Sequence, residues 1–299
     1  MNDAWRYHPC RDRATAAPRR LLSVLAAALV LSACTGGPPT TSRSTPSGPE
    51  STSSGAADAS TPPATAVPAA PPPAACYRLT SEQLTRPTNE SAPVPCTGPH
   101  TAATIHVGRL DTVVDGHSVA VDSAAVQRQL STTCPRKLAA YVGGSAETRS
   151  LSRVNVVWFS PTLEQSDQGA DWFRCDLIVF ATADALLPLP PTRRLDGMLD
   201  RAGALRSYGL CGTAAPGARD FERVVCSRRH SWRAIDTIPL AGGTGYPGVT
   251  VVRRAGNTTC RDLARSRAGS TLRFRYGWEW PTREQWARGQ HFGYCWVPG

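Results

Sequence analysis

WFSPTLEQSDQGADWFRC, at residues 158–175, and WEWPTREQWARGQHFGYC, at residues 278–295, are two copies of one segment. They align without a gap and carry the same residue at seven of 18 positions. The rare residues tryptophan and cysteine are among the identities, so the sequence predicts a duplicated structural unit. The identical pairs are Trp158/Trp278, Pro161/Pro281, Thr162/Thr282, Glu164/Glu284, Gln165/Gln285, Gly169/Gly289 and Cys175/Cys295.

The N-terminus has the pattern of an export signal. Arg11, Arg13, Arg19 and Arg20 precede the apolar run of residues 21–31, which would form about 16 Å of helix, roughly half of a bilayer core. We therefore interpret residues 1–33 as a signal peptide. The run ends in Leu-Ser-Ala-Cys, which resembles a bacterial lipobox, so Cys34 is the expected lipid-attachment residue, with palmitate among its acyl chains. The alternative is a secreted protein with a chance cysteine, and both Sec and twin-arginine export stay open.

Residues 34–75 consist almost wholly of Thr, Ser, Pro, Ala and Gly. Such a stretch cannot bury enough apolar surface to offset its chain entropy, so we expect a lipid-anchored disordered tether. Beyond it, we expect a first domain at residues 76–191, a connector at 192–204 and a second domain at 205–299.

Eight cysteines lie beyond the tether in two sets of four with matching surroundings. An even number of cysteines in an exported protein indicates disulfides, and four per unit allow three pairings. A zinc site is the competing interpretation, but such sites usually bring cysteines in close pairs, which this chain lacks. We therefore expect disulfides and no metal. The cysteines are Cys76, Cys96, Cys134, Cys175, Cys211, Cys226, Cys260 and Cys295.

The local patterns predict an α+β fold for each unit. Strands are expected after His100 and His230 and at residues 153–159 and 173–180. Apolar residues recur every fourth position from Val126 to Val142, which predicts a helix that Pro135 would kink or divide. Thr-x-x-Gln in both copies of the repeated segment is typical of a capping box. Each unit is therefore expected to be a small antiparallel sheet with a helix on one face.

An early cysteine, a Val-x-Cys-x-x-x-His strand, a cysteine on a helix and a closing Trp-Pro…Gly…Cys segment occur in order. This constellation resembles the septum formation family of actinobacterial envelope proteins, over two tandem copies from Cys76 to Trp296. The first copy departs from the pattern, with Ser160 and Ser166 in the positions of Trp280 and Trp286. The resemblance implies a membrane-attached, non-enzymatic protein linked to cell division. It also implies the pairs Cys76–Cys96, Cys134–Cys175, Cys211–Cys226 and Cys260–Cys295.

Catalytic candidates are few. His100 and His230 follow a cysteine by four residues and would activate it if it were free, but a structural histidine bonded to the turn backbone is the favoured interpretation. No nucleophile elbow, zinc-protease helix or phosphate loop is present, so we expect no catalytic residue and no cofactor. The aromatic residues near the C-terminus favour a small core, with a binding patch as the alternative. They are Trp278, Trp280, Trp286, Phe292, Tyr294 and Trp296.

The net charge differs between the two repeats. Residues 76–210 carry 13 basic and 13 acidic side chains, whereas residues 211–299 carry 14 arginines and 6 acids. A basic surface outside the cell can meet anionic lipid headgroups or acidic wall polymers, and nucleic acid is not an expected partner there. Solubility alone is the competing explanation. The candidate residues for an anionic partner are Arg223, Arg228, Arg229, Arg233, Arg253 and Arg254.

The leading functional hypothesis is a lipid-anchored, non-catalytic envelope protein that binds an unknown envelope protein or an anionic wall polymer, with a role in cell division. Two alternatives from other classes stay open. One is a wall-modifying enzyme with an unrecognised site, and the other is an extracytoplasmic thiol–disulfide protein.

Overall fold

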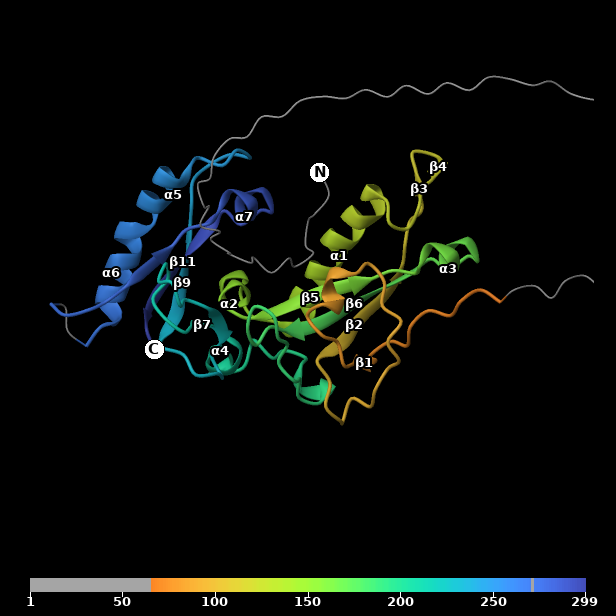
Figure 1. Cartoon of the computed structure of the whole chain (residues 1–299), viewed down its shortest axis with the longest axis horizontal. Coiled ribbons are helices and arrows are strands. Elements are labelled where there is room, and N and C mark those ends of the chain that lie inside the picture. The colour runs from red at the N-terminus through yellow and green to blue at the C-terminus, as the bar shows by residue number, and fades with distance from the viewer. Residues whose placement is uncertain (1–65, 270–271) are drawn as a thin grey trace, which may run out of the picture. The chain divides into compact units, whose positions relative to one another are not determined.

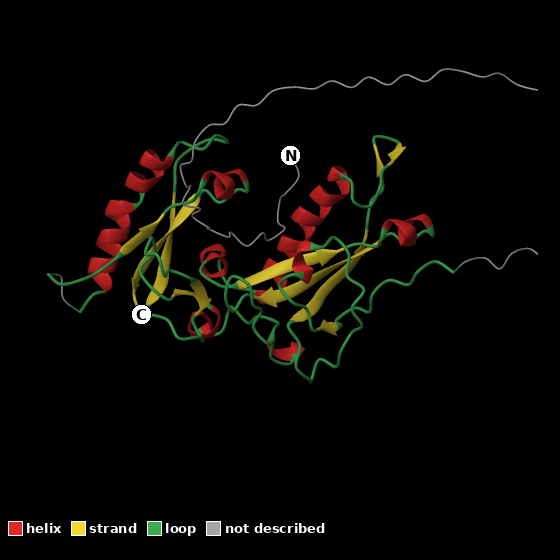
Figure 2. Ribbon diagram, viewed as in Figure 1, coloured by secondary structure: helices red, strands yellow, loops and turns green. Residues whose placement is uncertain are grey.

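The computed structural model describes residues 66–269 and 272–299, in which each repeat is an antiparallel sheet with helices against one face (Figure 1 and Figure 2). This confirms the α+β prediction. The expected signal peptide, Cys34 and most of the expected tether lie outside the described residues. No described helix is long and apolar enough to cross a membrane.

The first repeat has the strand order β1-β2-β6-β5, with every neighbouring pair antiparallel. A two-stranded ribbon, β3-β4, follows β2. Its elements are β1 (Cys76–Tyr77), η1 (Gln83–Thr85), β2 (Ala102–Arg109), β3 (Val113–Val114), β4 (His117–Ser118), α1 (Ala124–Val142), α2 (Ala146–Ser150), β5 (Val154–Phe159), α3 (Leu163–Asp167) and β6 (Trp172–Val179).

The second repeat has the order β10-β11-β9-β7-β8, again antiparallel throughout. Two short helices, η2 (Thr192–Arg194) and α4 (Ala204–Tyr208), precede it. Its elements are β7 (Leu210–Gly212), β8 (Arg223–Val225), β9 (Trp232–Pro239), α5 (Val249–Ala255), α6 (Asn257–Arg267), β10 (Gly277–Glu279), α7 (Arg283–Ala287) and β11 (Phe292–Pro298).

The duplication extends to strand register. Trp158 is the partner of Cys175 in the first sheet, and Trp278 is the partner of Cys295 in the second. Each sheet also has one shift in strand register. Ile105 has no partner where β2 pairs with β6, and Ile235 has none where β9 pairs with β11. An extra residue in one strand increases the local twist of the sheet. The two repeats therefore share an irregularity as well as a topology.

Helix α1 packs its apolar face on the first sheet. Val126, Leu130 and Cys134 are fully buried in a cluster with residues of β5 and β6. Ser123 caps the N-terminus by accepting a hydrogen bond from the Val126 amide, and Gly143 ends the helix at φ +71°. α1 runs as one helix through Pro135, so this proline does not divide it. Packing and the disulfide at the adjacent Cys134 offset the roughly 3 kcal/mol cost of an internal proline.

The turn that follows β5 and β10 is built identically in both repeats. Thr162 and Gln165 exchange side-chain and backbone hydrogen bonds at 3.1 Å and 3.1 Å, and Thr282 and Gln285 do so at 2.8 Å and 3.2 Å. The predicted capping boxes are therefore confirmed. The helix in each copy is followed by a glycine at positive φ, +94° at Gly169 and +90° at Gly289, where a side chain would be strained.

Four disulfides hold the repeats, two in each. Cys134–Cys175 and Cys260–Cys295 join a helix to the last strand of its sheet, and Cys76–Cys96 and Cys211–Cys226 close the loops at the start of each repeat. They are the pairs that the family resemblance implies.

The sheet face away from the helix carries a buried ion pair in the first repeat. Because Cys175 points to α1, its neighbours Arg174 and Asp176 point to the opposite face. The two side chains are 3% and 0% exposed and pair at 3.0 Å. Thr104 donates a hydrogen bond to Asp176 at 2.7 Å, and Arg174 lies 3.8 Å from the ring centre of Tyr77. Burial raises the pKa of Asp176, while Arg174 and Thr104 act in the opposite direction.

The second repeat has a more exposed pair on the corresponding face. Arg223 contacts Glu279 at 2.6 Å, with the two side chains 26% and 21% exposed. Glu279 also accepts a hydrogen bond from the indole of Trp296 at 3.0 Å. Both sheets therefore use a charged pair among aromatic residues, but only the first buries it fully.

The residues that join the repeats pack in the core of the first one. Leu195, Met198 and Leu199 belong to the same buried cluster as Val142 and Leu177. The Gly144 amide donates a hydrogen bond to Asp200 at 2.7 Å, which fixes this segment to the end of α1. The expected connector, residues 192–204, is therefore a packed part of the structure.

Backbone hydrogen bonds also cross from one repeat to the other. The Arg153 amide donates to Tyr208 and the Leu210 amide to Leu151, both at 2.7 Å, and the Val225 amide donates to Ala181 at 2.9 Å. Val225 is buried with the first repeat's core, and Leu151 with the second's. The two repeats share core residues and hydrogen bonds and do not form independent domains.

Candidate functional site

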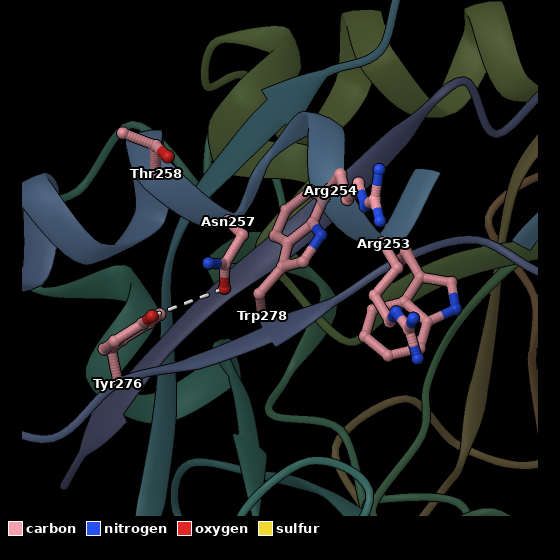
Figure 3. Close-up of a pocket in the computed structure, with 7 residues that line it drawn as sticks. Arg253, Arg254, Asn257, Thr258, Tyr276 and Trp278 are labelled. Atoms are coloured by element: carbon pink, nitrogen blue, oxygen red, sulfur yellow. Dashed lines mark hydrogen bonds between the residues drawn. The ribbon is translucent and has the colours of Figure 1, made fainter. Parts of the chain in front are cut away.

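The second repeat contains a groove between its two-part helix and the edge strand β10. It has a volume of about 740 Å³ and is open to solvent. One wall comes from α5 and α6, and the other from side chains at alternate positions along β10 and its flanks (Figure 3). The lining residues are Arg253, Arg254, Asn257, Thr258, Tyr276, Trp278 and Trp280.

Gly256 creates this geometry. It lies between α5 and α6, and a Cβ at this position would lie 2.2 Å from the Trp278 ring. Gly293 approaches the same six-membered ring of the indole just as closely, with its Cβ position 2.3 Å away. The Trp278 Nε1 donates to the Val252 carbonyl at 3.2 Å. The indole is therefore held between two glycines and forms a fixed floor for the groove.

Arg253 and Arg254 supply the charge of the groove. Both are exposed, and within the described residues neither has an ion-pair partner. None of the seven lining residues carries a carboxylate, an imidazole or a thiol. The groove is therefore positively charged and can attract anions. It lacks the side chains that most often act as general bases or metal ligands.

The other arginines expected to bind an anionic partner lie elsewhere. Arg228 and Arg229 are exposed in the turn between β8 and β9, and Arg223 pairs with Glu279. Arg233 is half-buried, and its Nε has no hydrogen-bond partner among the described atoms. Of the six candidates, the structure brings only Arg253 and Arg254 into the groove.

The C-terminal aromatic residues divide between core and groove. Trp278, Trp286, Tyr294 and Trp296 are buried, at 7%, 1%, 8% and 0% exposure. The buried Trp286 donates its indole N–H to Gly243 at 3.3 Å, so its polar edge is satisfied within the fold. Trp280 and Tyr276 are only partly buried and line the groove. Most of these side chains therefore belong to the core, and a binding patch could include Trp280 and Tyr276.

Three of the seven lining residues were not among the sequence-derived candidates: Asn257, Thr258 and Tyr276. Tyr276 precedes Trp278 and Trp280 at a spacing of two, so strand periodicity could have placed it on the same face. Asn257 and Thr258 depend on the interruption of the helix at Gly256, which has no unambiguous signal in one sequence.

The first repeat has the same scaffold without the groove chemistry. Alignment through Cys134 and Cys260 places Gln127 opposite Arg253 and Leu130 opposite Gly256. Alignment of the repeated segments places Ser160 opposite Trp280. Leu130 is fully buried on a continuous helix, and it packs in one cluster with Trp158, the buried equivalent of Trp278.

The histidine and cysteine candidates have structural roles. His100 Nδ1 lies 2.8 Å from the Gly98 carbonyl, and His230 Nδ1 lies 2.7 Å from the Arg228 carbonyl. The interpretation of structural histidines bonded to the turn backbone is therefore confirmed. All eight cysteines of the described residues are in disulfides, so none of them is available as a thiolate. Within the described chain, no cluster of three or more metal-binding side chains occurs.

Fold and groove together define a duplicated, disulfide-bonded α+β protein with one basic groove. The family model described as septum formation matches the chain twice, at residues 60–160 and 145–295. The chain therefore belongs to the septum formation family. No curated protein and no solved structure matches it.

Proposed function

We propose that this protein is a lipid-anchored, non-catalytic envelope protein that binds an anionic envelope component through its second repeat during septum formation. The observation that carries this proposal is the pair of exposed arginines in the groove, Arg253 and Arg254, without a carboxylate among the lining residues. Membership of the septum formation family supports the link to division. The lipobox-like sequence that ends in Cys34 supports the anchor.

A non-catalytic role is favoured by the chemistry of the groove lining. The side chains are guanidinium, amide, hydroxyl and aromatic groups, which bind and orient but rarely exchange protons near neutral pH. The eight disulfide-bonded cysteines likewise argue against thiol–disulfide exchange as the function.

The anchor is tested separately by Cys34→Ala in cells. One residue supplies both the cleavage position and the lipid attachment, so this variant is expected in the medium or as an unprocessed precursor. Membrane retention with the mature mass unchanged would refute lipid anchoring, and it would leave the binding proposal untouched.

Anion binding is tested on the mature sequence from residue 34 with Cys34→Ser, so that no acyl chain competes. Retention is measured on phosphatidylglycerol vesicles and on purified wall material across a salt series. Arg253→Gln/Arg254→Gln is expected to weaken binding roughly 30-fold at low salt, since each arginine near an anionic surface contributes about 1 kcal/mol. Arg228→Gln/Arg229→Gln is the matched control, because it removes the same charge from exposed residues outside the groove.

The control pair is expected to change binding by less than about threefold through general charge alone. Equal losses in the two double variants would mean that diffuse charge, and not the groove, carries binding. Retention that is indifferent to salt would contradict an electrostatic interaction altogether. Isolated repeats are unsuitable for this test, because separating them would expose Leu151 and Val225.

A further inference from the structure

We infer that the groove between α5–α6 and β10 is a subsite for an acidic glycan, with one such subsite in each chain. The inference rests on the proposed function, because it names the chemistry of the anionic component. Its chemical basis is the combination of guanidinium groups, an indole face and hydroxyl-binding side chains in one open groove.

The groove has two chemically distinct ends. Arg253 and Arg254 lie at one end, and Asn257 and Tyr276 at the other, with Trp278 between them (Figure 3). A carboxylate or phosphate on the ligand would bind at the arginine end, where guanidinium groups match its geometry. A ligand that used the whole groove must therefore carry both an anionic group and a neutral polar part.

The neutral part is matched by the far end of the groove. The Tyr276 hydroxyl donates to Asn257 Oδ1 at 3.3 Å, so the Asn257 amide nitrogen keeps both of its donors for another partner. The Thr258 hydroxyl lines the same wall and can donate or accept. Amide and hydroxyl groups of this kind suit the hydroxyls of a sugar ring.

The aromatic side chains supply a platform for the ring itself. Trp278 and Trp280 are two residues apart on one strand and therefore point to the same face. Trp278 is fixed by its hydrogen bond and its two glycine neighbours, whereas Trp280 is partly exposed to the groove. The apolar C–H face of a hexose packs well on an indole, and Trp280 has the exposed surface for this contact. The buried Trp278 holds the strand in place beside it, which lowers the conformational entropy lost on binding.

The shape of the groove favours a polymer chain over a membrane surface. Its volume of about 740 Å³ lies in the range of sites for small ligands, and because it is open to solvent a longer chain could extend beyond it. A bilayer surface has headgroup charge but offers no ring face to an indole at the bottom of a groove. The first repeat keeps Arg128, Thr132 and Trp158 at the positions of Arg254, Thr258 and Trp278. It has Gln127 and Ser160 in place of Arg253 and Trp280, so it lacks the second guanidinium and the exposed indole, and we expect a single site.

The test uses the mature sequence from residue 34 with Cys34→Ser and a defined probe, the tetramer of galacturonate. Isothermal titration is expected to give one site per chain. The methyl-esterified tetramer keeps the rings and loses the charge, so it is expected to bind at least tenfold more weakly. Trp280→Ser, which installs the residue of the first repeat, is expected to weaken tetramer binding about tenfold and to leave retention on phosphatidylglycerol vesicles unchanged.

Trp280→Phe keeps an aromatic ring and is expected to restore most of the affinity, which separates stacking from a fold defect. Unchanged affinity in Trp280→Ser, equal affinity for the acid and its ester, or two sites per chain would each overturn the inference. Groove-dependent retention on vesicles without tetramer binding would overturn the glycan assignment and leave the proposed function standing. Binding to neither probe would overturn both.

Discussion

The two repeats differ most where their helices cross the sheets. In the first, α1 is one continuous helix with Leu130 buried beneath it, whereas in the second the helix is interrupted at Gly256 between α5 and α6. Strand order, register shift, disulfides and capping boxes are otherwise shared. The comparison teaches that a duplicated scaffold can gain a groove through a few residues on one helix and one edge strand.

The largest effects are expected from the disulfides between helix and sheet, which close 41 residues in the first repeat and 35 in the second. Replacing either pair by alanine is expected to cost about 4 kcal/mol of unfolding free energy in the chain-entropy model. Urea unfolding measures this loss. Cys260→Ala/Cys295→Ala is also expected to abolish vesicle binding, because α6 and β10 form the two walls of the groove. The matched pair in the first repeat should unfold as easily but, while folded, bind normally.

The second comparison concerns the two ion pairs on the opposite sheet faces. Asp176→Ala leaves Arg174 buried without its carboxylate and is expected to cost about 3 kcal/mol. Glu279→Ala affects a more exposed pair and is expected to cost about 1 kcal/mol. Thermal and urea unfolding of the two variants measure which substitution lowers the stability more. A larger loss for Glu279→Ala would show that burial does not control the energies of these pairs.

The third comparison concerns the helix interruption itself. Gly256→Ala places a methyl group within 2.2 Å of the fixed Trp278 ring, so one of them must move. We expect about 2 kcal/mol of destabilisation from overpacking. We also expect a loss of anion binding at temperatures where the variant is folded. Retained binding with unchanged indole fluorescence would mean that the floor of the groove does not depend on Gly256.

The smallest effect is expected at the junction of the repeats. Burial raises the pKa of Glu147 on α2, and the nearby charge and hydrogen bond of Asp236 on β9 raise it further. An acid with a raised folded pKa contributes stability that is present below its ordinary pKa, here 4.5, and is lost as pH rises through the folded value. Glu147→Gln is therefore expected to remove part of a decline in stability as the pH rises above about 4.5.

Urea unfolding at several pH values measures this decline. Glu164→Gln, on α3 and away from the junction, is the control. If the unfolding free energy depends on pH in the same way in wild type and Glu147→Gln, the carboxyl groups of Glu147 and Asp236 do not contribute to it.

Much of the fold could be predicted because the duplication doubles each signal. Apolar residues at every fourth position placed a helix in the first unit, the repeat extended this expectation to the second, and Thr-x-x-Gln placed a helical turn in both. The continuity of α1 through Pro135 could not be predicted in this way. It depends on packing and on a disulfide partner 41 residues away, whereas propensity is local.

The candidate site was predictable only in part. Charge counting identified Arg253 and Arg254 but also included Arg223, which is used in an internal ion pair. Aromatic density could not separate Trp280 from Trp296, because burial depends on which sheet face and which helix each residue meets. The buried pair Arg174–Asp176 was missed for the same reason, since its partners Tyr77 and Thr104 come from other strands.

The packed connector also bears on the protein's resistance to proteolysis. Surface proteases cleave exposed, extended chain, and Leu195, Met198 and Leu199 are buried against the first repeat. Cutting between the repeats would first require that segment to detach and its hydrogen bonds to α1 to open. The second repeat is therefore not expected to be cut free while the first stays folded. Proteolysis upstream of the repeats would release the groove together with both of them.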